Sequence, residues 1–175
     1  MKSRKLVTCA MLIALHTVLS LFVSVNLGNM KITFDALPII IGAMLYGPVG
    51  GMVIGLLGAF FAQLLSYGLS VTTVLWILPA AFRGFFVGSF AKLLGEKFKG
   101  KVMLFVIVAS SLLVTALNTG VMAADAIIYG YYSHAYVFGA LIFRIISGVI
   151  TAVLYTVVVP ELLKYLRQAG IRSEL

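Results

Sequence analysis

Long apolar stretches separated by short polar segments make up most of the chain. They lie at about residues 6–26, 36–47, 50–67, 73–91, 102–124 and 137–160. A helix needs roughly 20 consecutive apolar residues to cross the hydrocarbon core of a bilayer. The pattern therefore predicts an all-α membrane protein built from transmembrane helices.

The second and third apolar runs are too short to be assigned by length alone. Together they contain about 30 residues, or roughly 45 Å of helix, which is generous for one crossing and tight for two. Charge patterning decides between one crossing and two. Three basic clusters flank the spans: Lys2, Arg4 and Lys5; Lys92, Lys97, Lys99 and Lys101; and Lys164, Arg167 and Arg172.

The positive-inside rule places all three clusters in the cytoplasm, which requires an odd number of crossings between Lys31 and Lys92. We therefore predict a hairpin over residues 36–67, with its turn at residues 47–51, Gly-Pro-Val-Gly-Gly. Proline ends one helix there and the glycines permit the reversal. The prediction is a bundle of six transmembrane helices, with the N- and C-termini both cytoplasmic.

Composition supports a single membrane domain over residues 1–175. Hydrophobic residues make up 62% of the chain and charged residues 10%, against about 45–50% and 25% in soluble domains. We therefore expect a multi-pass protein of the cell membrane. The formal charge of +8 sits in clusters beside apolar runs, which indicates contact with the membrane surface rather than with nucleic acid. Cys9 is the only cysteine, which excludes an internal disulfide and a multi-thiolate metal site.

Small residues recur at helical spacing in three places. Gly51 and Gly55 form one pair, and Gly84 and Gly88 form another that Ala80 extends by one turn. Small residues four apart let membrane helices approach closely, so we expect these pairs to pack inside the bundle. A third pair, Ala10 and Ala14, lies near the cytoplasmic end of the first span, where we expect a partner protein to dock.

Polar side chains gather in the outer half of the predicted bundle. They are Gln63, Trp76, Arg83, Asn118 and Arg144. An arginine near the centre of a membrane helix costs about 2.5–3.5 kcal/mol on the insertion scale, so both arginines are expected to face the interior. The two alternatives are an internal partner, such as Asp125 or a backbone carbonyl, and an anionic ligand. The pattern favours a cup that is open outside and sealed below.

Two predicted outer segments add candidate ligand contacts. Residues 26–35 include Lys31, Phe34 and Asp35, and residues 129–136 include four tyrosines, among them Tyr132. Flat aromatic ligands stack well on such side chains. Tyrosines also favour membrane interfaces whether or not a ligand is bound, so the role of this cluster has two interpretations.

No motif for catalysis is apparent. Residues 95–101, Gly-Glu-Lys-Phe-Lys-Gly-Lys, match most of a phosphate-binding loop, but Val102 replaces the hydroxyl residue that the magnesium ion requires. His16 and His134 lack metal-ligand spacing with other histidines or carboxylates. We therefore expect a binding protein with no metal or cofactor of its own, whose ATP, if used, is hydrolysed by another chain.

Two segments and the alanine pair resemble one family over nearly the whole chain. Residues 32–55 resemble the second and third helices of the S components of energy-coupling-factor (ECF) transporters, and Ala10 and Ala14 are similar to the alanine motif of their first helix. Residues 72–84, which contain Trp76 and Arg83, resemble the fourth helix of the folate-specific members. One departure is that Gly58-Ala59-Phe60 stands where many S components carry an aspartate.

The resemblance implies a six-helix vitamin-binding protein that associates with a transmembrane T component and two cytoplasmic ATPase subunits. The T component would contact the alanine face. Folate fits the predicted cup, because it has a flat pterin, an aromatic middle and two carboxylates, which suit arginine and amide side chains. The expected substrate contacts are Arg83, Arg144, Gln63, Trp76, Asn118, Lys31, Phe34, Asp35 and Tyr132.

Two alternatives to a folate S component remain at this point. One is an S component for another vitamin, such as riboflavin, thiamine or a pyrimidine precursor; the arginines disfavour a cation such as thiamine. The other is a membrane scaffold or assembly factor without transport activity, in which the arginines would be paired internally.

Overall fold

The protein is a bundle of long helices, as a computed structural model shows. It describes residues 2–27, 30–169 and 171, with side chains at all of these except residues 2, 24–27 and 30–32. The elements are α1 (Lys2–Phe22), β1 (Ser24–Leu27), β2 (Met30–Thr33), α2 (Ala36–Tyr67), α3 (Thr73–Leu94), the short 3₁₀ turn η1 (Gly95–Lys97), α4 (Gly100–Ile128), α5 (His134–Phe138) and α6 (Leu141–Gln168).

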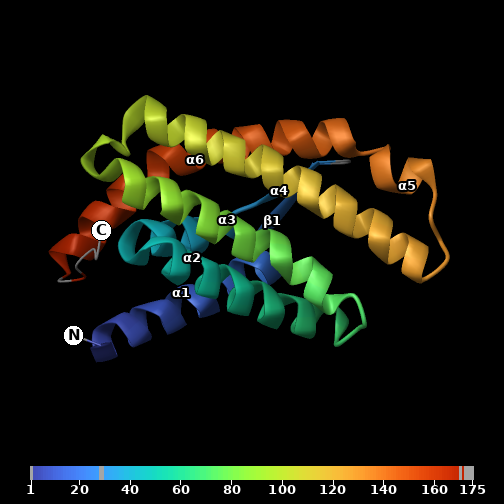
Figure 1. The fold of residues 1–175 in the computed structure, drawn as a ribbon, viewed down its shortest axis with the longest axis horizontal. Coiled ribbons are helices and arrows are strands. Elements are labelled where there is room, and N and C mark those ends of the chain that lie inside the picture. Colours follow the sequence, from blue (N-terminus) through green and yellow to red (C-terminus); the bar gives the residue numbers. More distant parts are fainter. Residues whose placement is uncertain (1, 28–29, 170, 172–175) are drawn as a thin grey trace.

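The ends of the helices separate into two groups (Figure 1). The start of α1, the connection from α3 to α4 and the end of α6 lie at one end of the bundle, whereas α5 and the connection from α2 to α3 lie at the other. The described residues of the three basic clusters therefore lie at the same end, as the charge argument predicts, whereas Arg172 lies outside the described residues. We call this the basic end, and the opposite end the α5 end.

Five helices in the described part of the chain are long and apolar enough to cross a membrane, where the sequence predicts six. The difference lies in α2, which joins the predicted second and third spans. This helix is interrupted at Gly47, whose φ of 72° and ψ of −165° are not helical. Only glycine adopts such a conformation at low cost, and Pro48 directly follows it.

Contacts across Gly47 show that α2 folds back on itself. A Cβ atom at Gly51 would lie 2.7 Å from the Cβ of Ala43, and one at Gly42 would lie 2.2 Å from Cδ1 of Ile54. In a straight helix these residue pairs would be about 12 and 18 Å apart. The predicted hairpin is therefore confirmed, but its first arm has only 11 residues from Ala36 to Tyr46. That is about 16 Å of helix, or roughly half of the hydrocarbon core.

The paired glycines bring α2 and α3 into backbone contact. A Cβ at Gly84 would lie 2.0 Å from the carbonyl oxygen of Gly51, and one at Gly55 would lie 2.3 Å from that of Ala80. Gly88 is similarly close to the backbone at Gly47. The small residues thus serve packing within the molecule, as expected.

A β-hairpin separates α1 from α2, and the sequence analysis did not predict it. Strands β1 and β2 pair antiparallel, with Val25 opposite Ile32. The Tyr155 hydroxyl in α6 donates a hydrogen bond of 2.7 Å to the Thr33 carbonyl at the end of β2. His16, which lies six residues before the end of α1, contacts the Asp35 carbonyl. The segment 26–35, expected to be an outer loop, therefore ends about 9 Å closer to the basic end than α1 does.

Candidate functional site

A polar cavity of about 340 Å³ lies between the helices. It extends from Ser66 and Tyr67, at the α5 end of α2, to Tyr155 in α6. Small-molecule sites usually occupy about 300–1,000 Å³, so the cavity has the size of a ligand site. Six of the nine predicted substrate residues line it: Asp35, Gln63, Trp76, Arg83, Asn118 and Arg144. These six residues come from five separate parts of the chain, namely the residue before α2, α2 itself, α3, α4 and α6.

Arg83 enters the cavity from α3 without a partner in the part of the chain that the structure describes. Its Nε atom is buried and donates no hydrogen bond to any described residue. Asp35 and Arg83 line the same cavity, yet no ion pair joins them in the described residues. A buried guanidinium nitrogen without a hydrogen bond is costly. Arg83 is therefore the side chain in this cavity that most needs a polar ligand.

Arg144 differs from Arg83 because two of its nitrogens have partners. One terminal nitrogen donates to the Val137 carbonyl, and the other contacts the Met122 sulfur at 2.8 Å. Its Nε atom is buried and without a partner among the described residues. The alternative of an internal carbonyl partner thus applies to Arg144 in part and does not apply to Arg83.

Asp125 is not the partner of either arginine. Its carboxylate accepts hydrogen bonds from Thr72 and Tyr131, and from the indole nitrogen of Trp76 at 3.2 Å. The bond to Asp125 raises the pKa of the Tyr131 hydroxyl above its ordinary value, so this tyrosine remains a donor at physiological pH. The network fixes the indole ring of Trp76 in the cavity wall.

The floor of the cavity contains residues that the sequence analysis missed. His16 Nδ1 lies 2.6 Å from the Asp35 carbonyl, and because a carbonyl only accepts, this nitrogen donates. Thr33 donates to the Asp35 carboxylate at 2.9 Å. Hydroxyl groups of Ser20, Thr115, Ser147, Thr151 and Tyr155 also line the cavity. The floor is therefore rich in groups that can donate and accept hydrogen bonds.

Three predicted substrate residues are not among those that line the cavity. Phe34 packs against the hydrophobic core. Tyr132 is exposed at the α5 end, where its ring meets His134 edge to face at 5.7 Å. Lys31 lies in β2, and its side chain is outside the described residues.

Gly58, in the stretch where the sequence departs from the expected aspartate, lies against His16 of α1. A Cβ at Gly58 would lie 2.6 Å from the His16 ring, and the Gly58 carbonyl accepts a 3.3 Å hydrogen bond from Thr17. The ring of His16 occupies the space that a side chain would need. An acidic residue at this position would have to displace α1 from α2.

Ala10 and Ala14 lie on an exposed face of α1. Leu6, Val7, Met11 and Val18 are exposed on the same helix. Small side chains flanked by larger apolar ones leave a shallow surface that suits close approach by another membrane helix.

Comparisons with known proteins identify the family from the sequence and support the fold from a solved structure. A family model described as "ECF transporter, substrate-specific component" matches residues 4–162. A solved structure of the S component of a bacterial ECF transporter superposes with a TM-score of 0.70 at 19% sequence identity, covering 95% of this chain and 99% of that one. No curated protein sequence matches this chain.

Proposed function

Because the chain belongs to the family of substrate-specific components of ECF transporters, we propose that it captures folate outside the cell for ATP-driven uptake. Members of this family are integral membrane proteins that bind substrate and are not enzymes. Membership also implies a small-molecule substrate, and a T component and ATPase subunits as partners. Beyond family membership, we propose the identity of the substrate, the residues that contact it and the face that docks onto the T component.

The unpaired guanidinium of Arg83 in a polar cavity carries the folate proposal. An arginine presents a planar set of donors that matches a carboxylate or the acceptor atoms of a pterin ring. A bound ligand with such acceptors supplies the hydrogen bonds that the described residues do not. Arg144, from α6, adds a second cation that can bind another acceptor group of the ligand.

The remaining lining fits the other parts of folate. Gln63 and Asn118 each offer an amide, which can match the donor and acceptor atoms along the edge of a pterin. The Trp76 ring, fixed by Asp125, offers a flat surface for an aromatic group. The Asp35 carboxylate can accept from the exocyclic amino group of a pterin. Riboflavin, another flat heterocycle, is the second candidate, because the five hydroxyl side chains of the floor also suit a sugar-like chain.

The docking proposal rests on α1. The exposed Ala10 and Ala14 face is the surface that the T component contacts. ATP is hydrolysed by the partner subunits, and this chain needs no metal or cofactor of its own to bind its substrate.

Arginine substitutions test the substrate proposal. Folate affinity is measured by isothermal titration of the purified protein in detergent for Arg83→Ala, Arg144→Ala and the two lysine variants. Loss of a charge-assisted hydrogen bond costs about 1.5–3 kcal/mol, so Arg83→Ala is expected to weaken binding roughly 10- to 150-fold. Arg144→Ala is expected to have the smaller effect, because Val137 and Met122 already engage that side chain. Lysine should rescue neither fully, because it lacks the planar fork.

Arg167→Ala serves as the matched control, because this exposed arginine lies in the last turn of α6, at the basic end. It should bind folate like the wild type. Wild-type affinity in Arg83→Ala would contradict the proposed site. A preference for riboflavin over folate in a panel of vitamins would support the same binding site with riboflavin as its ligand.

A further inference from the structure

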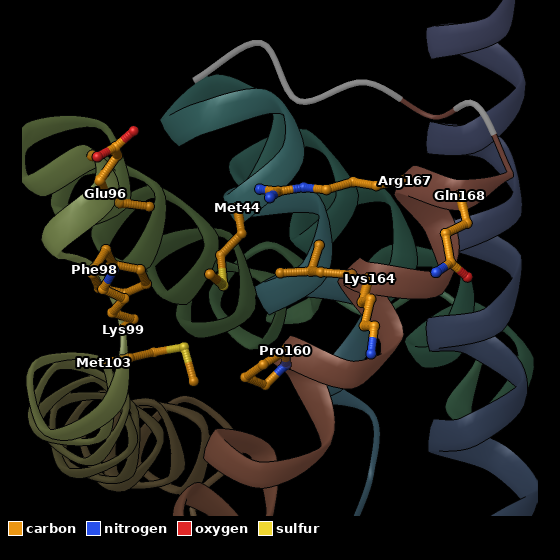
Figure 2. Close-up of a pocket in the computed structure, with 12 residues that line it drawn as sticks. Met44, Glu96, Phe98, Lys99, Met103, Pro160, Lys164, Arg167 and Gln168 are labelled. Carbon is orange, nitrogen blue, oxygen red and sulfur yellow. The ribbon is translucent and has the colours of Figure 1, made fainter.

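A second and larger hollow, of about 1110 Å³, lies at the basic end of the molecule (Figure 2). One side is formed by the end of α3, by the α3–α4 connection and by the start of α4, and the other by the last turns of α6. Met44, from the first arm of α2, lies between them. The residues that line this groove are Met44, Ala91, Gly95, Glu96, Phe98, Lys99, Met103, Pro160, Leu163, Lys164, Arg167 and Gln168. It shares none of them with the substrate cavity.

The groove has an apolar floor and a cationic rim. Ala91, Phe98, Met103 and Leu163 are buried. Lys99, Lys164 and Arg167 are exposed, and Glu96 is the carboxylate among the lining residues. Figure 2 shows Arg167 extending from α6 towards Met44 and the α3–α4 connection. No ion pair neutralises the three cations within the described residues. Three cations against one carboxylate give the rim a positive field beside an apolar surface.

Both the position and the size of the groove favour a lipid. The basic clusters place this end at the cytoplasmic surface of the membrane, where anionic headgroups are concentrated. Basic pockets between membrane helices on this side suit such headgroups, and long Lys and Arg side chains readily reach the headgroup level. The hollow also exceeds the usual range for small-molecule sites. A compact soluble anion would fill only a small part of this volume.

We propose that this groove binds an anionic phospholipid of the cytoplasmic leaflet. Lys99, Lys164 and Arg167 contact the phosphate, and the acyl chains lie against Phe98, Met103 and Leu163. The site does not depend on which vitamin the substrate cavity takes. A lipid bound there would contact both the α3–α4 connection and the end of α6, which face each other across the groove.

Native mass spectrometry of the full-length protein in detergent tests the proposal. Phosphatidylglycerol and phosphatidylcholine with the same acyl chains are titrated separately, and inorganic phosphate is added as a competitor. We expect phosphatidylglycerol to bind more tightly, and the double variant Lys164→Gln with Arg167→Gln to lose roughly 10- to 30-fold in affinity for it. Lys92→Gln with Lys101→Gln is the control, since it removes two exposed cations at the same end but outside the groove.

Each other result overturns the proposal. Equal binding of the two lipids shows that the cationic rim does not select an anionic headgroup. An equal loss in the control pair shows general attraction to the basic surface. Displacement by inorganic phosphate shows a site for a free anion. Retained lipid binding with lost assembly onto the T component and ATPase subunits shows a protein interface.

Discussion

Asp125 shows how one buried carboxylate can hold the wall of a cavity that it does not itself line. It accepts from Thr72 at the start of α3, from Trp76 one turn later and from Tyr131 beyond the end of α4. Three donors compensate the desolvation of one carboxylate, which is why the residue can be buried at the α5 end. The hydrogen bond to Asp125 orients the Trp76 ring. Because Trp76 lines the cavity, the network also shapes the cavity wall.

Removing the carboxylate should therefore disturb Trp76. Asp125→Ala leaves three donors without their acceptor, and we expect it to lower stability by about 1–3 kcal/mol. Trp76 is the only tryptophan, so its fluorescence emission reports the change directly. Tyr131→Phe removes one of the three bonds and should have a smaller effect on both measurements. Unchanged emission and thermal stability in Asp125→Ala would show that the network does not hold the indole.

The residues of the cavity that could be predicted are those whose chemistry is unusual in a membrane helix. Arg83, Arg144, Gln63 and Asn118 stand out within apolar runs, and the structure brings all four to one cavity. His16 and Tyr155 could not be found in this way. Tyr155 meets Thr33 across 122 positions of sequence, and His16 takes its role from the Asp35 carbonyl. Both depend on a chain segment whose path the apolar pattern does not reveal.

At the scale of elements, local sequence signals predict the hairpin of α2. The β-hairpin also has a signal in the sequence, but a weaker one. Gly47 and Pro48 mark the first reversal, and the basic clusters require it. Residues 24–33 read Ser-Val-Asn-Leu-Gly-Asn-Met-Lys-Ile-Thr. Apolar and polar residues alternate on both sides of a Gly-Asn pair, which is a hairpin signal. The alternation is short and lies beside a long apolar run, so by itself it does not distinguish a hairpin from a loop.

The contact between α2 and α3 gives a prediction for one element pair. Gly84→Ala places a methyl group 2.0 Å from the Gly51 carbonyl oxygen, so the two backbones must move apart. Overpacking of this kind costs about 1–3 kcal/mol, and we expect a lower unfolding temperature in detergent. Gly120→Ala in α4 is the matched control, because a Cβ there meets no heavy atom within 4 Å. It should be neutral or slightly stabilising. Equal stability of the two variants would contradict the close packing of α2 and α3.

At the scale of the whole molecule, the basic end should lie in the cytoplasm. Single cysteines at Lys97 and Lys164, in a Cys9→Ser background, are expected to react with a membrane-impermeant thiol reagent only after the cells are opened. A cysteine at Ser133, in the connection before α5, should react from outside. Labelling of position 97 in intact cells would show that the protein has the opposite orientation, with the substrate cavity on the inner side.

The exposed face of α1 gives the last prediction, which concerns assembly. Ala10 and Ala14 lie in an exposed apolar stripe, and tryptophan at both positions would prevent close approach by a partner helix. We expect Ala10→Trp with Ala14→Trp to abolish copurification with the T component and ATPase subunits. Folate affinity should stay within about twofold of the wild type, because neither residue lines the cavity.

Val157→Trp is the control for added bulk, since Val157 is 68% exposed on α6 and lies outside both the cavity and the α1 face. It should assemble normally. Loss of folate binding together with assembly in the double alanine variant would mean that the alanines support the bundle itself. Normal assembly of that variant would mean that the T component docks elsewhere.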